Sequence, residues 1–209
     1  MNTQKTPISG IVKKRRILFQ LVGISLISSL LTNKAKGQAK HQSEFKVLGE
    51  KDQIDIGDNG QEILEKAYKL GYDFEKKHGG CCRCTVAALQ RAIDFVPEDK
   101  GLFRAASCLD GGATPAGIQN CGAFTGAGMV IGWLCGADNF GNTKLSHQLI
   151  RQVYKQFETE YGNVLCKDVR KKINSNCPEV VARAAKWTAE TLLRQFTNYE
   201  TERKEKLHG

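Results

Sequence analysis

The stretch "NCGAFTGAGMVIG", residues 120–132, is the part of this sequence that most constrains the fold. Asn120 is a residue type favoured at helix N-caps, and Cys121 follows it directly. Each glycine inside a helix costs up to about 1 kcal/mol relative to alanine, so the close approach of another backbone should offset that cost. The stretch therefore predicts a tightly packed helix with a thiol in its first turn. Its glycines are Gly122, Gly126, Gly128 and Gly132.

Helical periodicity continues on both sides of this stretch. Apolar residues recur at steps of three and four, whereas no convincing period-two alternation is present. The glycine-rich segment 110–119 is expected to be a loop. The pattern predicts an all-α fold, a compact bundle of five to seven helices. The expected helices run from Gly60 to the Gly79-Gly80 pair, over 82–95, over 99–109, from Asn120, from Leu145 to near Gly162, and from about Val181 to Tyr199.

The positive charge of the chain is concentrated in one segment. The formal net charge is +9, but residues 1–37 hold seven basic residues and no acidic one. Removing those seven from 31 leaves 24 basic against 22 acidic residues, which is close to neutral. No nucleic-acid partner is expected, because binding to a phosphate backbone depends on an excess of cationic side chains.

Residues 1–37 have the organisation of an export signal. The basic run Lys13-Lys14-Arg15-Arg16 precedes the apolar segment 17–31, and Ala35-Lys36-Gly37 offers small residues at a cleavage spacing. The paired arginines resemble a twin-arginine signal, which exports folded proteins. The apolar segment is short for a transmembrane helix. We expect an exported, periplasmic or otherwise extracytoplasmic protein that contacts the membrane only through this segment before cleavage; an uncleaved anchor is the alternative.

Eight cysteines lie between residues 81 and 177, and four of them fall near expected helix starts. Each of the four follows a helix-breaking glycine or an N-cap residue, or precedes a proline that favours a first turn. The positive end of a helix dipole lowers the pKa of a thiol from about 8.5, and the thiolate is both a nucleophile and a ligand for soft metals. If the helix starts converge, they form a four-thiolate site or two reactive pairs. The four are Cys84, Cys121, Cys166 and Cys177.

The order of these motifs resembles a known family. Its elements are a cysteine entering the alanine-rich segment 84–89, the core Cys121-Gly122-Ala123-x-x-Gly126, and two later cysteines beyond Tyr161-Gly162. Over residues from about 60 to 195 the chain is similar to the C-GCAxxG-C-C family of redox-active proteins and to the non-haem part of split-Soret cytochromes. That resemblance implies an iron-sulfur cluster held by Cys84, Cys121, Cys166 and Cys177, with Gly122, Ala123 and Gly126 shaping the site.

Cys81, Cys82 and Cys84 are clustered, so the sequence does not decide which of the three is the functional cysteine. Cys81 and Cys84 form a C-x-x-C pair at a helix start, as in dithiol redox motifs. A thiol-disulfide oxidoreductase that uses Cys81, Cys84 and Cys121 is therefore the second hypothesis. A zinc site of four thiolates, or a non-catalytic module with structural disulfides, is a further alternative. No c-type haem is expected, because Thr85 stands where covalent attachment needs histidine.

The remaining cysteines, Cys108 and Cys135, lie near the C-terminal ends of expected helices. There the helix dipole disfavours a thiolate, and free cysteine is among the most buried residue types. We expect both thiols to be buried or joined in a mutual disulfide.

Together these patterns predict an export signal at 1–37, a linker at 38–58 and a helical, cysteine-rich redox domain at 59–209. The expected role is electron transfer through an iron-sulfur cluster, rather than catalysis in a substrate pocket of its own. We expect a redox partner protein, which the sequence does not identify. A homodimer is left open, because the site could bridge two subunits.

Overall fold

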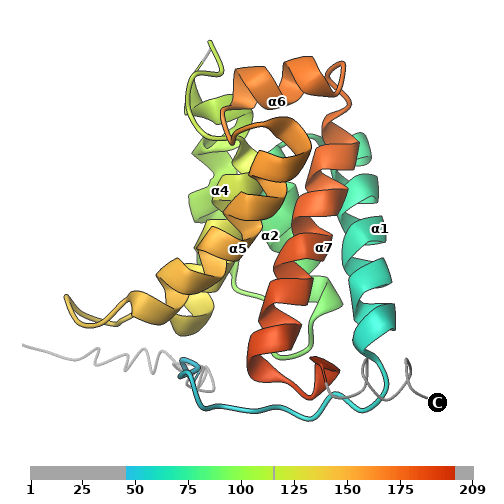
Figure 1. The fold of residues 1–209 in the computed structure, drawn as a ribbon. Coiled ribbons are helices and arrows are strands. Elements are labelled where there is room, and N and C mark those ends of the chain that lie inside the picture. Colours follow the sequence, from blue (N-terminus) through green and yellow to red (C-terminus); the bar gives the residue numbers. More distant parts are fainter. Residues whose placement is uncertain (1–45, 115, 201–209) are drawn as a thin grey trace, which may run out of the picture. The chain divides into compact units, whose positions relative to one another are not determined.

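A computed structural model describes residues 46–114 and 116–200, and the expected export signal at 1–37 lies outside the described residues. Within that range the chain forms seven α-helices and two 3₁₀ turns, and its β pairing is limited to two isolated bridges (Figure 1). The all-α expectation is confirmed. The elements are α1 (Gly60–His78), α2 (Cys81–Ala92), α3 (Lys100–Ala105), η1 (Ala106–Cys108), η2 (Asp110–Ala113), α4 (Gly122–Cys135), α5 (Lys144–Tyr161), α6 (Cys166–Lys172) and α7 (Cys177–Phe196).

The C-terminal helix α7 is central to the packing, because it contacts α1, α2, α4 and α5. Leu192 and Phe196 on its inner face are fully buried in the apolar core. Helices α1 and α7 lie side by side (Figure 1), and Gly71 of α1 permits their close approach. A Cβ at Gly71 would lie 2.9 Å from the carbonyl oxygen of Val181, so a larger residue there would push the two helices apart.

The glycine-rich helix α4 packs against α2, as close backbone approach requires. A Cβ at Gly126 would lie 2.7 Å from the carbonyl oxygen of Cys82. A Cβ at Gly132 would meet nothing within 4 Å, so the expected packing role is wrong for that glycine. The expected N-cap is also displaced by one residue, because Cys121 rather than Asn120 precedes the first helical residue.

Two other boundaries differ from the sequence expectations. Helix α2 ends at Ala92, three residues early, because Ile93 has an extended backbone. The segment expected to be a loop at 110–119 begins with the short turn η2, in which Gly111 and Gly112 have positive φ angles of 62° and 74°. Glycine adopts this left-handed conformation without a steric penalty, so the turn depends on both residues.

Part of the segment expected to be a linker is joined to the helical bundle. The amide of Leu48 donates a hydrogen bond to the carbonyl oxygen of Leu134 (2.9 Å), and that of Ile54 donates to the carbonyl oxygen of Phe196 (2.7 Å). These bonds attach the segment ahead of α1 to the ends of α4 and α7. Among the described residues, no helix combines the length and the apolar character needed to cross a membrane.

Candidate functional site

Four helix starts converge on one small cavity and bring four thiols to its wall. The cavity has a volume of about 130 Å³, and its lining includes Cys81, Cys121, Cys166 and Cys177. Cys81, Cys166 and Cys177 are the first residues of α2, α6 and α7, and Cys121 immediately precedes α4. The structure thus brings together three of the four expected ligand positions. Cys81 takes the place that the sequence assigned to Cys84.

Backbone pairing explains why the starts of α4 and α6 meet. Asn120 and Leu165 form an isolated antiparallel bridge. Around it, the amide of Cys121 donates to the carbonyl oxygen of Val164 (2.7 Å), and the amide of Cys166 donates to that of Gln119 (2.9 Å). Two cysteines that are 45 positions apart in sequence are therefore held together by their own main chains, which leaves both side chains free for chemistry.

Glycines make room for the sulfur atoms. A Cβ at Gly122 would overlap Cys81 Sγ, so the thiol of α2 rests directly on the first residue of α4. A Cβ at Gly112 would lie 2.9 Å from Cys166 Cβ. Gly122 therefore has the shaping role implied by the family resemblance, whereas Gly112 was missed. The Gly111-Gly112 pair was visible in the sequence, but only as a loop signal.

Cys84 and Cys82 do not line the cavity, although Cys84 lies next to Glu75, which does. The Cys84 thiol donates to the carbonyl oxygen of Gly79 (3.3 Å), and burial, followed by the charge of Glu75, raises its pKa to about 12. The Cys82 sulfur lies 3.7 Å from Met129 Sδ, and burial raises the pKa of Cys82 to about 12. Of the three clustered cysteines, Cys81 is the one that lines the cavity.

The thiols of Cys81 and Cys121 form a hydrogen-bonded pair with unequal proton affinities. The hydrogen bond from Cys121 lowers the pKa of Cys81 despite its burial, and the amide of Gly111 acts in the same direction. Donation to Cys81, together with burial, raises the pKa of Cys121 well above its ordinary value. When the pair loses one proton, the thiolate therefore forms at Cys81 and the remaining proton stays on Cys121.

The expectation that all four helix starts lower the thiol pKa is wrong for the other positions. Burial raises the pKa of both Cys166 and Cys177, and the positive charge of Arg170 only partly opposes this shift. The cost of removing a thiolate from water exceeds the benefit of a helix terminus at these sites. These thiols would stay protonated unless a bound cation compensated the negative charge.

Charged residues that sequence reasoning missed surround the sulfur atoms. Glu75 lines the cavity; its Oε2 is buried without a hydrogen-bond partner, and burial raises the pKa of the carboxyl group. Asp110 accepts a hydrogen bond from the amide of Cys82 (2.7 Å) and lies 3.7 Å from Arg83 Nε. No motif marked these residues, because their relation to the cysteines arises from contacts between separate elements.

The last two cysteines lie outside the cavity. Cys135 is buried, as expected, and its thiol donates to the carbonyl oxygen of Ile131 (3.2 Å). Cys108 is exposed at the end of η1, so the expectation of burial is wrong for this residue. All eight cysteines are free in this structure, and the mutual disulfide is not formed.

The cavity has the donor set and the room for a group larger than a single ion. Its volume of about 130 Å³ is well above the roughly 10–15 Å³ that one water molecule requires. Four thiolates are the usual ligands of iron-sulfur clusters, whose ligands are distributed over several iron atoms. Among residues 46–114 and 116–200, no group of three or more His, Cys, Asp or Glu side chains lies close enough together to hold a single metal ion as the structure stands.

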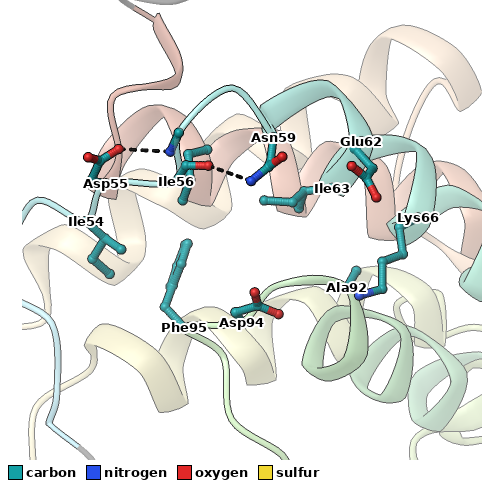
Figure 2. Close-up of a pocket in the computed structure, with 11 residues that line it drawn as sticks. Ile54, Asp55, Ile56, Asn59, Glu62, Ile63, Lys66, Ala92, Asp94 and Phe95 are labelled. Carbon is teal, nitrogen blue, oxygen red and sulfur yellow. Dashed lines mark hydrogen bonds between the residues drawn. The ribbon is translucent and has the colours of Figure 1, made fainter.

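A second, larger cavity of about 820 Å³ lies between the start of α1 and the end of α2 (Figure 2). Glu62 and Lys66 extend from α1, while Asp94 and Phe95 follow α2. Among the described residues that line it, none is a cysteine or histidine. We call it the acidic cleft, because Asp55, Glu62 and Asp94 outnumber Lys66 in its lining.

Comparison with known proteins identifies the family of the chain. A family model described as "Putative redox-active protein (C_GCAxxG_C_C)" matches residues 79–191, a range that includes all eight cysteines. Neither a curated protein nor a solved structure matches the chain. Because the match spans more than half of the 209 residues, the protein belongs to the C_GCAxxG_C_C family of redox-active, cysteine-rich proteins.

Proposed function

We propose that this protein transfers electrons through an iron-sulfur cluster held at the cysteine cavity. One observation carries the proposal: four thiols from four separate helix starts line a single cavity. The proposed ligands are Cys81, Cys121, Cys166 and Cys177. This set keeps three ligands implied by the family resemblance and replaces Cys84 with Cys81, because the Cys84 thiol is directed to the carbonyl oxygen of Gly79.

The protein's contribution is to hold and compensate four thiolates. The bridge between Asn120 and Leu165 fixes two ligand positions through the backbone, so the ligands are positioned before the group binds. Binding replaces the thiol protons, which offsets the burial that keeps three of the thiols neutral. The starts of α2, α4 and α7 place positive dipole ends near the sulfur atoms. When bound, the cluster would supply a one-electron redox couple.

Anaerobic purification from the native host, with iron, sulfide and zinc analysis, tests this proposal. We expect a brown protein with visible absorption, iron and acid-labile sulfide. Cys121→Ser should abolish the absorption, whereas Cys108→Ser, at an exposed cysteine outside the cavity, should retain it. The matched pair Cys81→Ser and Cys84→Ser identifies the fourth ligand. A colourless, iron-free protein would overturn the proposal, and stoichiometric zinc would favour a structural metal site.

The Cys81 and Cys121 pair supports a second candidate function, thiol-disulfide exchange. The Cys81 thiolate would attack one sulfur of a substrate disulfide, forming a mixed disulfide and releasing the first substrate thiolate. Cys121 would then transfer its proton to the released substrate thiolate and attack the Cys81 sulfur, which forms the Cys81-Cys121 disulfide, breaks the mixed disulfide and releases the second thiolate. The substrate gains two electrons and the protein dithiol loses them. Thiol titration with and without reductant tests this step; the absence of a reducible pair would exclude it.

We further propose that this chemistry takes place outside the cytoplasm. The basic run, the apolar segment and the small residues within 1–37 support export. Fractionation of the native host and N-terminal sequencing of the mature protein test it. A mature chain that starts just after Gly37 supports export with cleavage, and a cytoplasmic chain that begins at Met1 contradicts it.

A further inference from the structure

Exposed cations lie on α1 and α6, the two helices that bring Glu75 and Arg170 to the cysteine cavity. Arg170 of α6 belongs to its lining, and the rest of α6 contributes three lysines. The last turn of α1 contributes two more lysines, next to Glu75, which also lines the cavity. All six side chains are exposed. We call this set the basic rim; it consists of Lys76, Lys77, Lys167, Arg170, Lys171 and Lys172.

Three carboxylates also lie on or near the elements of the basic rim. Asp110 is paired with Arg83, and Asp168 accepts a hydrogen bond from the side-chain amide of Asn163 (3.0 Å). Glu75 has a buried carboxylate oxygen inside the cavity. Across residues 46–114 and 116–200, no ion pair includes a residue of the basic rim. The six cations of the basic rim therefore outnumber these three carboxylates, and none of the six forms an ion pair with them.

This local excess contrasts with the rest of the chain. Beyond residue 37 the sequence carries 24 basic and 22 acidic residues, so six unpaired cations at one cavity are a concentration and not a general property. A charged surface that surrounds a site raises the local concentration of oppositely charged partners and can increase association rates by about 10- to 1,000-fold. Because these cations lie near the cysteine cavity, they would attract an acidic partner to that part of the surface.

We propose that the basic rim docks a small electron-transfer protein with an acidic face. The inference rests on the proposed redox function, because electrons that reach the buried sulfur atoms must cross the nearest surface. The basic rim lies on α1 and α6 next to the lining residues Glu75 and Arg170, and it would orient an acidic partner over the cavity. Electrostatic complementarity of this kind sets orientation and association rate more than final affinity.

A charge-reversal experiment tests the docking surface. The probe is a plant-type [2Fe-2S] ferredoxin, a small acidic electron carrier. The test variant is Lys171→Glu with Lys172→Glu, because neither residue lines the cavity. The matched control is Lys66→Glu with Lys144→Glu, which makes the same charge change at two exposed lysines outside the basic rim. Each protein is first assayed for iron and visible absorption, and then titrated with ferredoxin at low and high salt.

We expect the test variant to weaken ferredoxin binding by about tenfold at low salt, and high salt to do the same to the wild-type protein. The control should stay within about twofold of wild type. An equal loss in the control, or no ferredoxin binding at low salt, would overturn the proposal. Binding to anionic lipid vesicles but not to ferredoxin would also overturn it. Iron-free protein would contradict the cluster alone, since ferredoxin binding is read independently of bound iron.

Discussion

The two cavities at opposite ends of α2 differ in what forms their walls: backbone contacts at one end and side chains at the other. The cysteine cavity at Cys81 has a volume of about 130 Å³, whereas the acidic cleft next to Ala92 has about 820 Å³. Gly122 contacts, left-handed turns and a backbone bridge define the smaller cavity. The walls of the larger one are flexible charged side chains and apolar side chains (Figure 2). Size alone would select the acidic cleft, but the nucleophiles and metal ligands lie in the smaller cavity.

The comparison teaches that a reactive site can be recognised by how little freedom its backbone has. At the cysteine cavity, a single added methyl group would collide with a sulfur atom, because glycines separate the helices. At the acidic cleft, Glu62 and Lys66 are exposed and can move away from a new group. Substitutions at the cysteine end should therefore change stability and thiol chemistry together, whereas those at the cleft should change neither.

The largest expected effect is a difference in the free energy of unfolding between two Gly→Ala variants of the same helix. Gly122→Ala should destabilise the protein by about 1–3 kcal/mol, because its Cβ would overlap Cys81 Sγ and lie 2.9 Å from the carbonyl oxygen of Leu109. Gly132→Ala should stabilise it by up to about 1 kcal/mol, because its Cβ meets nothing within 4 Å. Urea denaturation measures both changes. Equal effects would show that α4 is not specially constrained at the cysteine end.

The next prediction concerns alkaline pH. In the folded protein, burial raises the pKa of Cys82 and that of Cys84 to about 12 each. Above pH 9 the unfolded chain loses these protons while the folded chain keeps them, so the free energy of unfolding falls as pH rises. The lowered pKa of Cys81 stabilises the fold above that pH and does not reverse the trend. We expect a loss of about 1 kcal/mol per thiol between pH 9 and 10.

Urea denaturation of reduced, iron-free protein at several pH values measures this loss. Cys82→Ala is the informative variant, because it removes one of the buried thiols with a raised pKa and should make the pH dependence shallower while lowering stability at every pH. An unchanged slope in this variant would contradict the assignment of alkaline sensitivity to the buried thiols.

A smaller effect is expected on the reactivity of Cys81. Cys121→Ala removes the thiol that donates to Cys81, so the pKa of Cys81 should rise and its alkylation by iodoacetamide at pH 7 should slow by about tenfold. Mass spectrometry of the Cys81 peptide measures the rate. Cys135→Ala is the control, because Cys135 donates to the carbonyl oxygen of Ile131 instead. Equal slowing in both variants would indicate a general loss of structure.

The smallest effect is expected at the acidic cleft. Asp94→Asn removes an exposed carboxylate, and no ion pair between described residues includes Asp94. Its free energy of unfolding should stay within about 0.5 kcal/mol of wild type. Iron content and the alkylation rate of Cys81 should be unchanged. A loss of either would show that the acidic cleft and the cysteine cavity at the two ends of α2 are coupled.

Local signals predicted much of the fold. The glycine pair at 79–80 correctly marked the end of α1, and Gly162 marked the end of α5. The same signals placed Cys166 and Cys177 at helix starts, where the structure has them. They failed at Gly132 and Cys108, because a sequence pattern does not specify which face of an element meets a neighbour. For the same reason, local signals could not decide whether Cys81 or Cys84 lines the cavity.

Capping residues, helix breakers and apolar periodicity act over a few neighbouring positions, so they specify the helical fold and the presence of cysteines at helix starts. Tertiary contacts alone pair Cys81 with Cys121, bury Cys166 and Cys177 so that their pKa rises, and place Arg170 of the basic rim in the cavity lining. These properties depend on contacts between residues far apart in the chain, such as Asn120 and Leu165, and on the exclusion of water that those contacts produce.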